Sequence, residues 1–516
     1  MSSPTVATLD PQLITVSPNI LPSQRRLMIM LMLALTALLH LATSGWGPIE
    51  NGPDGMNAAV ARELALGRMP SDIGHLWNQP VETTPKQWIT AQSFRIFKVN
   101  EFAARLPFAI ANLLTVAMVF LIAERIGGVW RGLASGIIAA TMSGTILQGR
   151  DGGGEAFTAL VLTMAIYAAI RMLEQKSPLF WQVFYWFTVA ALLAMGKPAA
   201  TLLITISLWM AFVFFREARL RLRPIIWIIG NGLLLGILIF FFRGQWNVTP
   251  FWDRGNIARY FGALFPWSVV ILPPLLLRSR KVLRLHELTP AESILWSLFI
   301  LGSLWVLTVP SMQVWPTNIA CLTLIFALLA SLVWERTSSQ IRMVGVAVLV
   351  GLAFFGMGFS ERIAGQEWLN LLQPIWWLSL GVIIIFGVAA MVSLYLRHSR
   401  AALLIIAAAT IPLAYNLLDA RARHGWQNSL KDFGQKVELG YMPETQIYVD
   451  ENIENVSSFL FYAPHGLRIH PTCPEIITRT ATNNYLLVSQ KKMSVWPESE
   501  RVGNNRSYVL LMLPKK

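Results

Sequence analysis

Residues 104–123 read ARLPFAIANLLTVAMVFLIA, an apolar run in which Arg105 is the one charged residue. A helix needs about 20 such residues to cross the hydrocarbon core of a bilayer. Counting comparable runs along the chain predicts an all-α polytopic membrane domain of about thirteen transmembrane helices. The runs, with approximate ends, are 27–45, 104–123, 131–148, 156–173, 179–196, 199–215, 224–242, 262–277, 291–309, 317–334, 341–359, 373–396 and 400–418.

The composition agrees with a membrane protein and argues against a soluble enzyme. Of the 516 residues, 54% are hydrophobic and 14% are charged, whereas soluble chains have about 25% charged residues. A net charge of +14 would suggest nucleic acid in a soluble protein. With the N-terminus in the cytoplasm, however, the cytoplasmic loops carry roughly three times as many Lys and Arg as the short outer loops. The charge is therefore an orientation signal, and no nucleic-acid partner is expected.

The chain divides into three parts. Residues 1–26 form a cytoplasmic segment, 27–418 form the transmembrane domain with a long first outer loop at 46–103, and 419–516 form an external domain. An odd number of spans places that last domain outside the membrane. We expect it to be a small α/β domain, because it contains short runs rich in β-branched and aromatic residues. These runs are 446–452, 484–490 and 507–513.

The first outer loop is too long to be a simple connector. A turn at Pro53-Asp54-Gly55 leads into an apolar-periodic segment at 57–66, which predicts a short helix lying flat on the membrane surface. Asp54 is a candidate general base for an acceptor hydroxyl or amine, and Glu82 a candidate to orient it. The alternatives are a turn or N-cap role for Asp54 and a solvated loop charge for Glu82.

Cations also lie in the outer loops. Arg150 begins a segment with three glycines and the acid Glu155, and such glycines allow close approach of the backbone to a ligand. An arginine there can clamp a phosphate, although a flexible turn with interfacial charges is the alternative. Lys197 and Arg254 lie in other outer turns, where cations are phosphate contacts or snorkelling anchors.

Other classes of site lack their motifs. Two cysteines, Cys321 and Cys473, provide neither a disulfide framework nor a cysteine metal site. No Walker, dinucleotide-binding, HExxH or GxSxG motif occurs. These absences argue against a nucleotide-driven pump and against an oxidoreductase with a soluble cofactor. No ligand cluster is defined either, so no cofactor is assigned and a divalent metal is left open.

The order of segments resembles the polytopic GT-C glycosyltransferases, most closely the bacterial aminoarabinose transferases of lipid A and the protein O-mannosyltransferases. VETTPKQWITAQSFRIFKVNEFAARLP (81–107) is similar to the Glu-Lys-Pro-Pro segment, aromatic helix and span entry of that family. The tail resembles its external α/β domain. Further similar segments are PDGMNAAVARELALG (53–67), LQGRDGGGEAF (147–157), MGKP (195–198) and LFPW (264–267).

The resemblance implies transfer of a sugar, with inversion, from a polyprenyl-phosphate-linked donor to a lipid, glycan or protein acceptor. It places the activity at the outer face of a bacterial inner membrane, among membrane lipids. It implies Asp54 and Glu82 as catalytic acids, Asp54 being the base, and Glu155 as an additional acid. Cations near the leaving phosphate stabilise its charge. The candidates for that role are Lys86, Arg150, Lys197 and Arg254.

The chain departs from the family at two motifs. The adjacent Asp-Glu pair is reduced to Pro53-Asp54, and Thr83 and Thr84 follow Glu82 where the family has Lys and Pro, with Lys86 as a substitute. A catalytically inactive scaffold is therefore one alternative. A transporter or flippase of lipid-linked sugars is another, and it should show mid-span polar residues and internal repeats.

Overall fold

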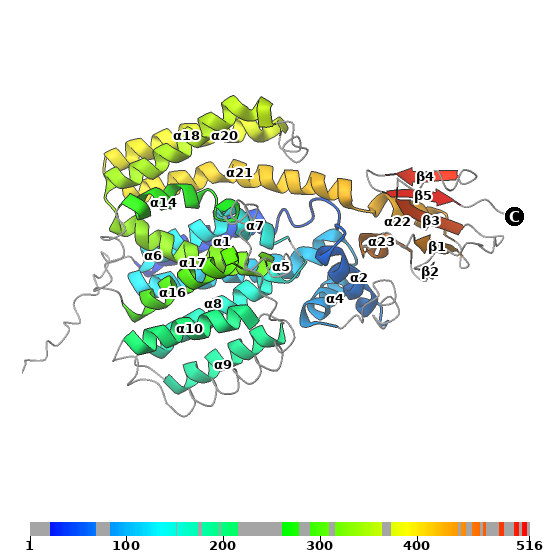
Figure 1. Cartoon of the computed structure of the whole chain (residues 1–516), viewed down its shortest axis with the longest axis horizontal. Helices are drawn as coiled ribbons and strands as arrows, with labels where there is room; N and C mark the ends of the chain where they lie inside the picture. Colours follow the sequence, from blue (N-terminus) through cyan, green and yellow to red (C-terminus); the bar gives the residue numbers. More distant parts are fainter. Residues whose placement is uncertain are drawn as a thin grey trace, which may run out of the picture. The chain divides into compact units, whose positions relative to one another are not determined.

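The structure is a computed structural model, and Figure 1 shows its helices and strands. It describes residues 21–68, 83–150, 152–173, 178–195, 198–214, 261–277, 289–308, 315–363, 373–441, 445–449, 457–464, 468–470, 484–489, 500–504 and 508–512. The chain forms two compact units, which are described separately. The first contains Met1–Thr36, Leu114–Met142 and Val161–Gly345, and the second contains Ala37–Leu113, Ser143–Leu160 and Val346–Lys516.

Most of the described chain is helical. The long helices include four that are long and apolar enough to cross a membrane, at Glu101–Gly127, Glu155–Leu173, Trp377–Tyr395 and Ser399–Arg423. The helices are α1 (Pro22–His40), α2 (Pro53–Ala65), α4 (Pro85–Phe97), α5 (Glu101–Gly127), α6 (Val129–Thr141), α7 (Ser143–Gln148), α8 (Glu155–Leu173), α9 (Pro178–Ala194), α10 (Pro198–Phe214), α14 (Trp267–Leu277), α16 (Pro290–Thr308), α17 (Trp315–Arg336), α18 (Ser339–Ile363), α20 (Gln373–Tyr395), α21 (Ser399–Asn428), α22 (Lys431–Leu439) and α23 (Ser457–Tyr462).

These helices agree with a polytopic membrane domain, but the count of thirteen spans is not confirmed. The predicted span 131–148 is not one continuous helix. It consists of two helices, because α6 ends at Thr141 and Met142 has extended backbone before α7 begins. The Thr141 hydroxyl accepts a hydrogen bond of 2.9 Å from the Trp267 indole at this break.

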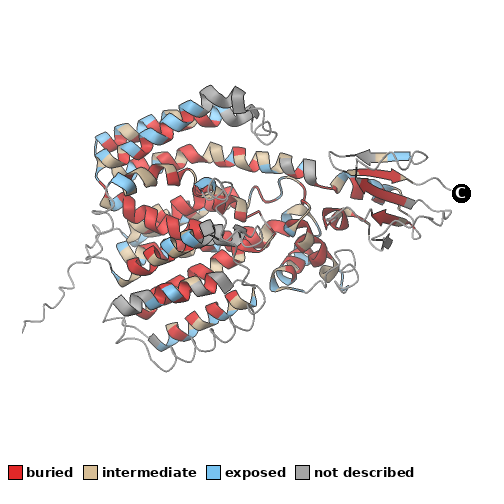
Figure 2. Cartoon of the chain, in the orientation of Figure 1, coloured by how far each residue is buried: buried red, intermediate tan, exposed pale blue. Residues whose placement is uncertain are grey.

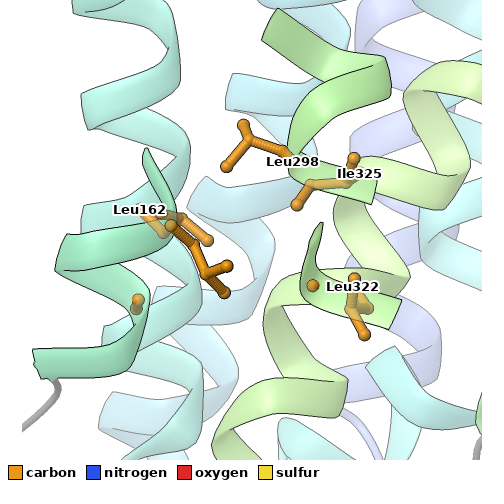
Figure 3. A pocket seen from close by; sticks show the side chains of 7 residues that line it. Leu162, Leu298, Leu322 and Ile325 are labelled. Carbon is orange, nitrogen blue, oxygen red and sulfur yellow. The ribbon is translucent and has the colours of Figure 1, made fainter. Parts of the chain in front are cut away.

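In the first unit, small residues let the helices pack closely, as is common between membrane helices. A Cβ atom on Gly302 would lie 2.6 Å from Leu322. Beside this contact, Leu162, Leu298, Leu322 and Ile325 line a cavity of about 10 Å³ (Figure 3). A space of that size with apolar walls stays dry, so we interpret it as a packing gap and not as a ligand site.

The second unit contains a five-stranded sheet of order β2-β1-β3-β5-β4. β1 (Gln446–Val449) is parallel to β2 (Arg468–His470) and β3 (Asn484–Ser489), while β5 (Tyr508–Met512) is antiparallel to β3 and β4 (Glu500–Asn504). One face packs on Phe433 of α22 and Phe459 of α23. The C-terminal region therefore contains the predicted small α/β fold, and α21 continues past residue 418 to Asn428 before it begins.

The helix predicted at 57–66 is present as α2, but its predicted environment is wrong. Ala58, Ala59, Val60 and Ala61 are buried, and α2 packs against α4 and α23. Small side chains allow this close approach of two neighbouring helices. Protein, and not the membrane surface, therefore covers the apolar face of α2.

Candidate functional site

A small pocket in the second unit brings together charged side chains from four parts of the chain. These parts are the segment that leads into α2 together with its first turn, the first turns of α5, the turn between α7 and α8, and the end of α21. The lining residues are Trp46, Pro48, Glu50, Asp54, Arg105, Arg150, Arg421 and Ala422. The pocket thus contains two of the predicted site residues, Asp54 and Arg150.

Asp54 lies in the first turn of α2. Pro53 occupies the start of the helix, and Gly52 precedes it with a φ of 118°, a conformation that favours glycine. Because Gly52 is the N-cap and Asp54 makes no cap bond, the N-cap alternative for Asp54 is wrong. The Asp54 carboxylate lies near the positive end of the helix dipole, and the residue is 8% exposed.

Arg105 holds this carboxylate in place. Its Nη2 atom lies 3.0 Å from Asp54 Oδ2, and the guanidinium also donates to the carbonyls of Gly47 and Pro48. The other oxygen, Oδ1, faces Gly152, where a Cβ atom would lie 2.6 Å away. The buried pair therefore fixes both the orientation of Asp54 and the course of the segment before α2.

Arg150 is a buried cation bound by backbone carbonyls. Its guanidinium donates to the carbonyl of Leu418 at 3.1 Å and to that of Trp46. Burial, together with the nearby charges of Arg105 and Arg421, lowers the pKa of Arg150 to about 9. An anion in the pocket would offset this repulsion.

Glu50 and Arg421 complete the set of charges. Their side chains form an ion pair of 3.2 Å, and Gly425, one turn along α21, leaves room for the Glu50 carboxylate. The three arginines and two carboxylates of the pocket give a formal charge of 3 − 2 = +1. The pocket, about 10 Å³ in volume, therefore has an excess of one positive charge and room for about one water molecule.

The glycine-rich turn after Arg150 contacts protein side chains. Gly152 packs against Asp54, and Lys86 Nζ donates a 2.8 Å hydrogen bond to the Gly153 carbonyl. Gly154 has a φ of +94°, and a Cβ atom there would lie 2.9 Å from the Lys86 side chain. Lys86 is thus beside the turn and is not among the residues lining the pocket. Glu155, the buried first residue of α8, is also not among them.

Three predicted site residues, Glu82, Lys197 and Arg254, lie outside the described residues. Three residues of the pocket, Glu50, Arg105 and Arg421, are not among the site residues predicted from the sequence. The lone Arg105 in the apolar run 104–123 indicates a functional site, because a charge inside a span is costly unless it has a partner. Across the described part of the chain, no three His, Cys, Asp or Glu side chains are grouped to hold a metal ion.

Helix α23 of the C-terminal region contacts the segment that positions Asp54. The Gly52 amide donates to Ser457 Oγ at 3.1 Å, and Ser458 Oγ donates to Asn51 Oδ1 at 2.7 Å. The Ile49 amide donates to the Tyr462 hydroxyl at 2.7 Å. These bonds come from three side chains of one short helix, so α23 fixes the backbone immediately before α2.

Arg62 of α2 makes the reverse contact. Its guanidinium donates to the carbonyls of Leu460, Phe461 and Ala463 at 2.6–2.9 Å. These are the otherwise unpaired carbonyls at the end of α23, where a cation is favourable. Arg62 is 6% exposed, so the contact is largely removed from water, and this burial lowers the pKa of Arg62.

Comparisons with known proteins agree with this architecture. The family model described as dolichyl-phosphate-mannose-protein mannosyltransferase matches residues 85–243. The crystal structure of ArnT from Cupriavidus metallidurans bound to undecaprenyl phosphate has a TM-score of 0.74 at 13% identity, covering 94% of this chain and 97% of that chain. The apo form of ArnT gives 0.71 at 14% identity, with the same coverage of both chains. No curated protein matches by sequence. The chain has the fold of ArnT, and the predicted resemblance to the polytopic GT-C glycosyltransferases is confirmed.

Proposed function

We propose that this chain is an integral membrane glycosyltransferase that takes a sugar from a polyprenyl-phosphate carrier. The acceptor is a lipid, glycan or protein at the outer face of a bacterial inner membrane. The N-terminus is cytoplasmic and the C-terminal domain periplasmic. The description of the matching family model and the name of the ArnT structure support the donor class, because the first refers to dolichyl phosphate and the second to undecaprenyl phosphate. Both compounds are polyprenyl phosphates.

The pocket is the observation that carries the proposal. A sugar linked to a polyprenyl phosphate is a phosphodiester with one negative charge, which balances the formal charge of +1 in the pocket. Arg150 is the candidate phosphate contact, because it is buried next to two further arginines. Fixed cations stabilise the charge that develops on a leaving phosphate.

The proposed reaction is a single displacement with inversion. The acceptor oxygen or nitrogen attacks the anomeric carbon on the face opposite the phosphate, and the bond from that carbon to the phosphate oxygen breaks. The phosphate leaves with the electron pair. Asp54, oriented by Arg105 through Oδ2, takes the proton of the acceptor.

The position of Asp54 supports an enzyme over an inactive scaffold. An Asp54 side chain in bulk water would favour the scaffold. Asp54 is instead 8% exposed and lines one pocket with Arg150. The loss of the neighbouring acid, replaced by Pro53, leaves Asp54 as the base in this part of the loop.

The test compares Asp54→Asn with Glu63→Gln, which removes a carboxylate from the same helix outside the pocket. Both proteins are purified in nanodiscs, supplied with undecaprenyl-phosphate-linked sugars and a bacterial membrane extract as the source of acceptor, and assayed for released undecaprenyl phosphate. Loss of a general base lowers turnover about 10²–10⁴-fold, whereas the control should retain activity. Unchanged turnover of a normally expressed Asp54→Asn protein would rule out the role of Asp54. The lipid-linked sugar that accumulates in cells lacking the protein identifies the donor.

A further inference from the structure

Three buried polar residues of the second unit lie in contact at the ends of α1 and α7 and on α5. They are His40, the last residue of α1, Asn112 of α5 and Thr145 of α7. All three are 0% exposed, and Figure 2 shows the buried residues of the helices in red. Polar side chains buried in a membrane domain are costly and are candidates for a functional role. None of the three is among the residues that line the pocket.

The Asn112 side chain links the other two residues. Its Nδ2 atom lies 2.6 Å from the Thr145 carbonyl oxygen and 3.1 Å from His40 Nδ1. Because a carbonyl oxygen can only accept, the atom of Asn112 that faces it is the amide nitrogen. The same NH₂ group donates its second hydrogen to His40, so Nδ1 is unprotonated. The neutral imidazole therefore carries its proton on Nε2.

The same residues pack against the glycine that precedes Arg150. A Cβ atom on Gly149 would lie 2.9 Å from His40 Nδ1 and 3.1 Å from Asn112 Nδ2. The Gly149 amide donates at 3.3 Å to the Thr145 carbonyl, the acceptor that Asn112 also uses. The absence of a side chain at Gly149 thus lets the end of α7 pack directly on α1 and α5.

Arg150 is held through its backbone as well as through its side chain. Its amide donates to the Leu147 carbonyl at 3.1 Å, within the turn that Gly149 packs against the cluster. Its guanidinium donates to the carbonyls of Trp46 and Leu418. Trp46 lies in the segment that follows α1. The end of α1 and the residues after it therefore contact both the turn and the side chain of Arg150.

We propose that His40 and Asn112 are positioning residues for Arg150, with neutral His40 as the hydrogen-bond acceptor that locks the turn at 149–150. Without an acceptor at Nδ1, one buried amide hydrogen of Asn112 is unpaired, and Asn112 rotates at the expense of its bond to Thr145. The turn then moves Arg150 out of position. The consequence for the donor rests on the proposed function, whereas the lock itself does not.

The test of the lock compares three substitutions of His40 in the full-length protein in nanodiscs. His40→Asn places an oxygen acceptor where Nδ1 lies, His40→Gln places its amide near Nε2, and His40→Leu offers no acceptor. Hydrogen exchange of the Gly149 and Arg150 amides measures opening of the turn without any substrate. Loss of one buried hydrogen bond should raise this exchange about tenfold in His40→Leu and His40→Gln. His40→Asn should exchange as the native protein does.

Two exchange results would overturn the proposal. One is exchange in His40→Asn as fast as in His40→Leu, because an acceptor at that place then holds nothing. The other is native exchange in all three variants. NMR of ¹⁵N-labelled histidine in the native protein gives a further readout, with His40→Asn identifying the signal. An unprotonated Nδ1 is expected, and a protonated Nδ1 contradicts the hydrogen bond from Asn112.

The turn is tested from its own side by Gly149→Ala, whose methyl group would meet His40 and Asn112. This variant should raise the exchange as His40→Leu does. Gly381→Ala on α20, where a Cβ atom would meet nothing within 4 Å, is the matched control and should exchange as the native protein at 149–150. Native exchange in Gly149→Ala would contradict the proposal, because the turn then does not press on the cluster.

Affinity for undecaprenyl phosphate tests the consequence for the donor. It should fall by up to about tenfold in His40→Leu, since only molecules with the held turn bind, and His40→Asn should retain it. His40→Leu should also raise the KM for the donor more than it lowers kcat. Unchanged affinity despite faster exchange would overturn the positioning role. A native protein that does not bind undecaprenyl phosphate would instead refute the proposed function, and the exchange of the turn would still decide the lock.

Discussion

Helices α2 and α4 have the same length and the same kind of start, yet they have opposite surroundings. Each has 13 residues and a proline at its first position, and both belong to the outer segment between α1 and α5. Protein covers most of α2, whereas α4 exposes large apolar residues. The covered face of α2 consists mainly of alanines, which admit close neighbours, whereas the exposed side of α4 carries Trp88 and Ile96. Apolar periodicity alone thus identifies a helix but not the medium on its apolar face.

The largest effect should come from breaking the buried pair that anchors the start of α2. Arg105→Met leaves the Asp54 carboxylate buried and uncompensated, which costs about 3–5 kcal/mol. Thermal unfolding in nanodiscs measures the loss. The double variant Arg105→Met and Asp54→Asn should recover a large part of it, and a double variant no more stable than Arg105→Met would show that the pair is not the cause.

A matched pair of arginines compares the two helices directly. Arg62→Met on α2 removes charged hydrogen bonds to the end of α23 and should lower the free energy of unfolding by about 1.5–3 kcal/mol. Arg95→Met on the exposed side of α4 should change it by about 0.5 kcal/mol or less. Hydrogen exchange of α23 should rise in the first variant alone. Equal effects of the two substitutions would refute the distinction between a covered and an uncovered helix.

The buried cation of the pocket should titrate where an exposed arginine does not. Because the pKa of Arg150 is lowered to about 9, its guanidinium is charged below that pH and loses its charge above it. One pH unit higher, affinity for undecaprenyl phosphate should fall by up to about tenfold. The contribution of Arg150 to folding stability changes in the opposite sense, since the cost of burying its charge disappears as the pH rises. Isothermal titration calorimetry measures the affinity for undecaprenyl phosphate over this pH range. The curve for Arg150→Gln should lack the inflection near the pKa.

The smallest effect should come from the serines of α23. Ser457→Ala removes the bond to the Gly52 amide and should cost about 1 kcal/mol, measured by thermal unfolding. If α23 positions Asp54, the same variant lowers kcat more than it raises the KM for the donor. If Ser457→Ala lowers stability but leaves kcat and KM unchanged, α23 stabilises the fold and does not position Asp54.

The sequence was sufficient for the features that depend on local chemistry. The helical class, the start of α2 and the candidate pair Asp54 and Arg150 follow from apolar runs, turn residues and motif resemblance. Arg105 was passed over because hydropathy averages one charge into an apolar run, and its partner is far away in sequence. Arg421 follows the apolar end of the last run, where the helix continues and Asp419 and Arg423 pair one turn apart, at 2.7 Å.

The break at Met142 shows another limit of the sequence. Residues on both sides of it are apolar or small, so composition does not change where the helix ends. A long-range hydrogen bond from Trp267 to Thr141 accompanies the break. Contacts of that kind become visible only when the chain is folded.

The bonds between α2 and α23 also determine how the C-terminal region can be exchanged between related proteins. Arg62, Asn51 and the Ile49 amide each have a specific counterpart on α23. A chimera that replaces the sheet and its helices but keeps the native residues 49–65 loses the side-chain counterparts Ser458 and Tyr462 together. Arg62 keeps its backbone acceptors only if the new helix ends in the same place. Successful grafting requires the two segments to be transplanted as one unit, although about 400 residues separate Arg62 from its α23 acceptors.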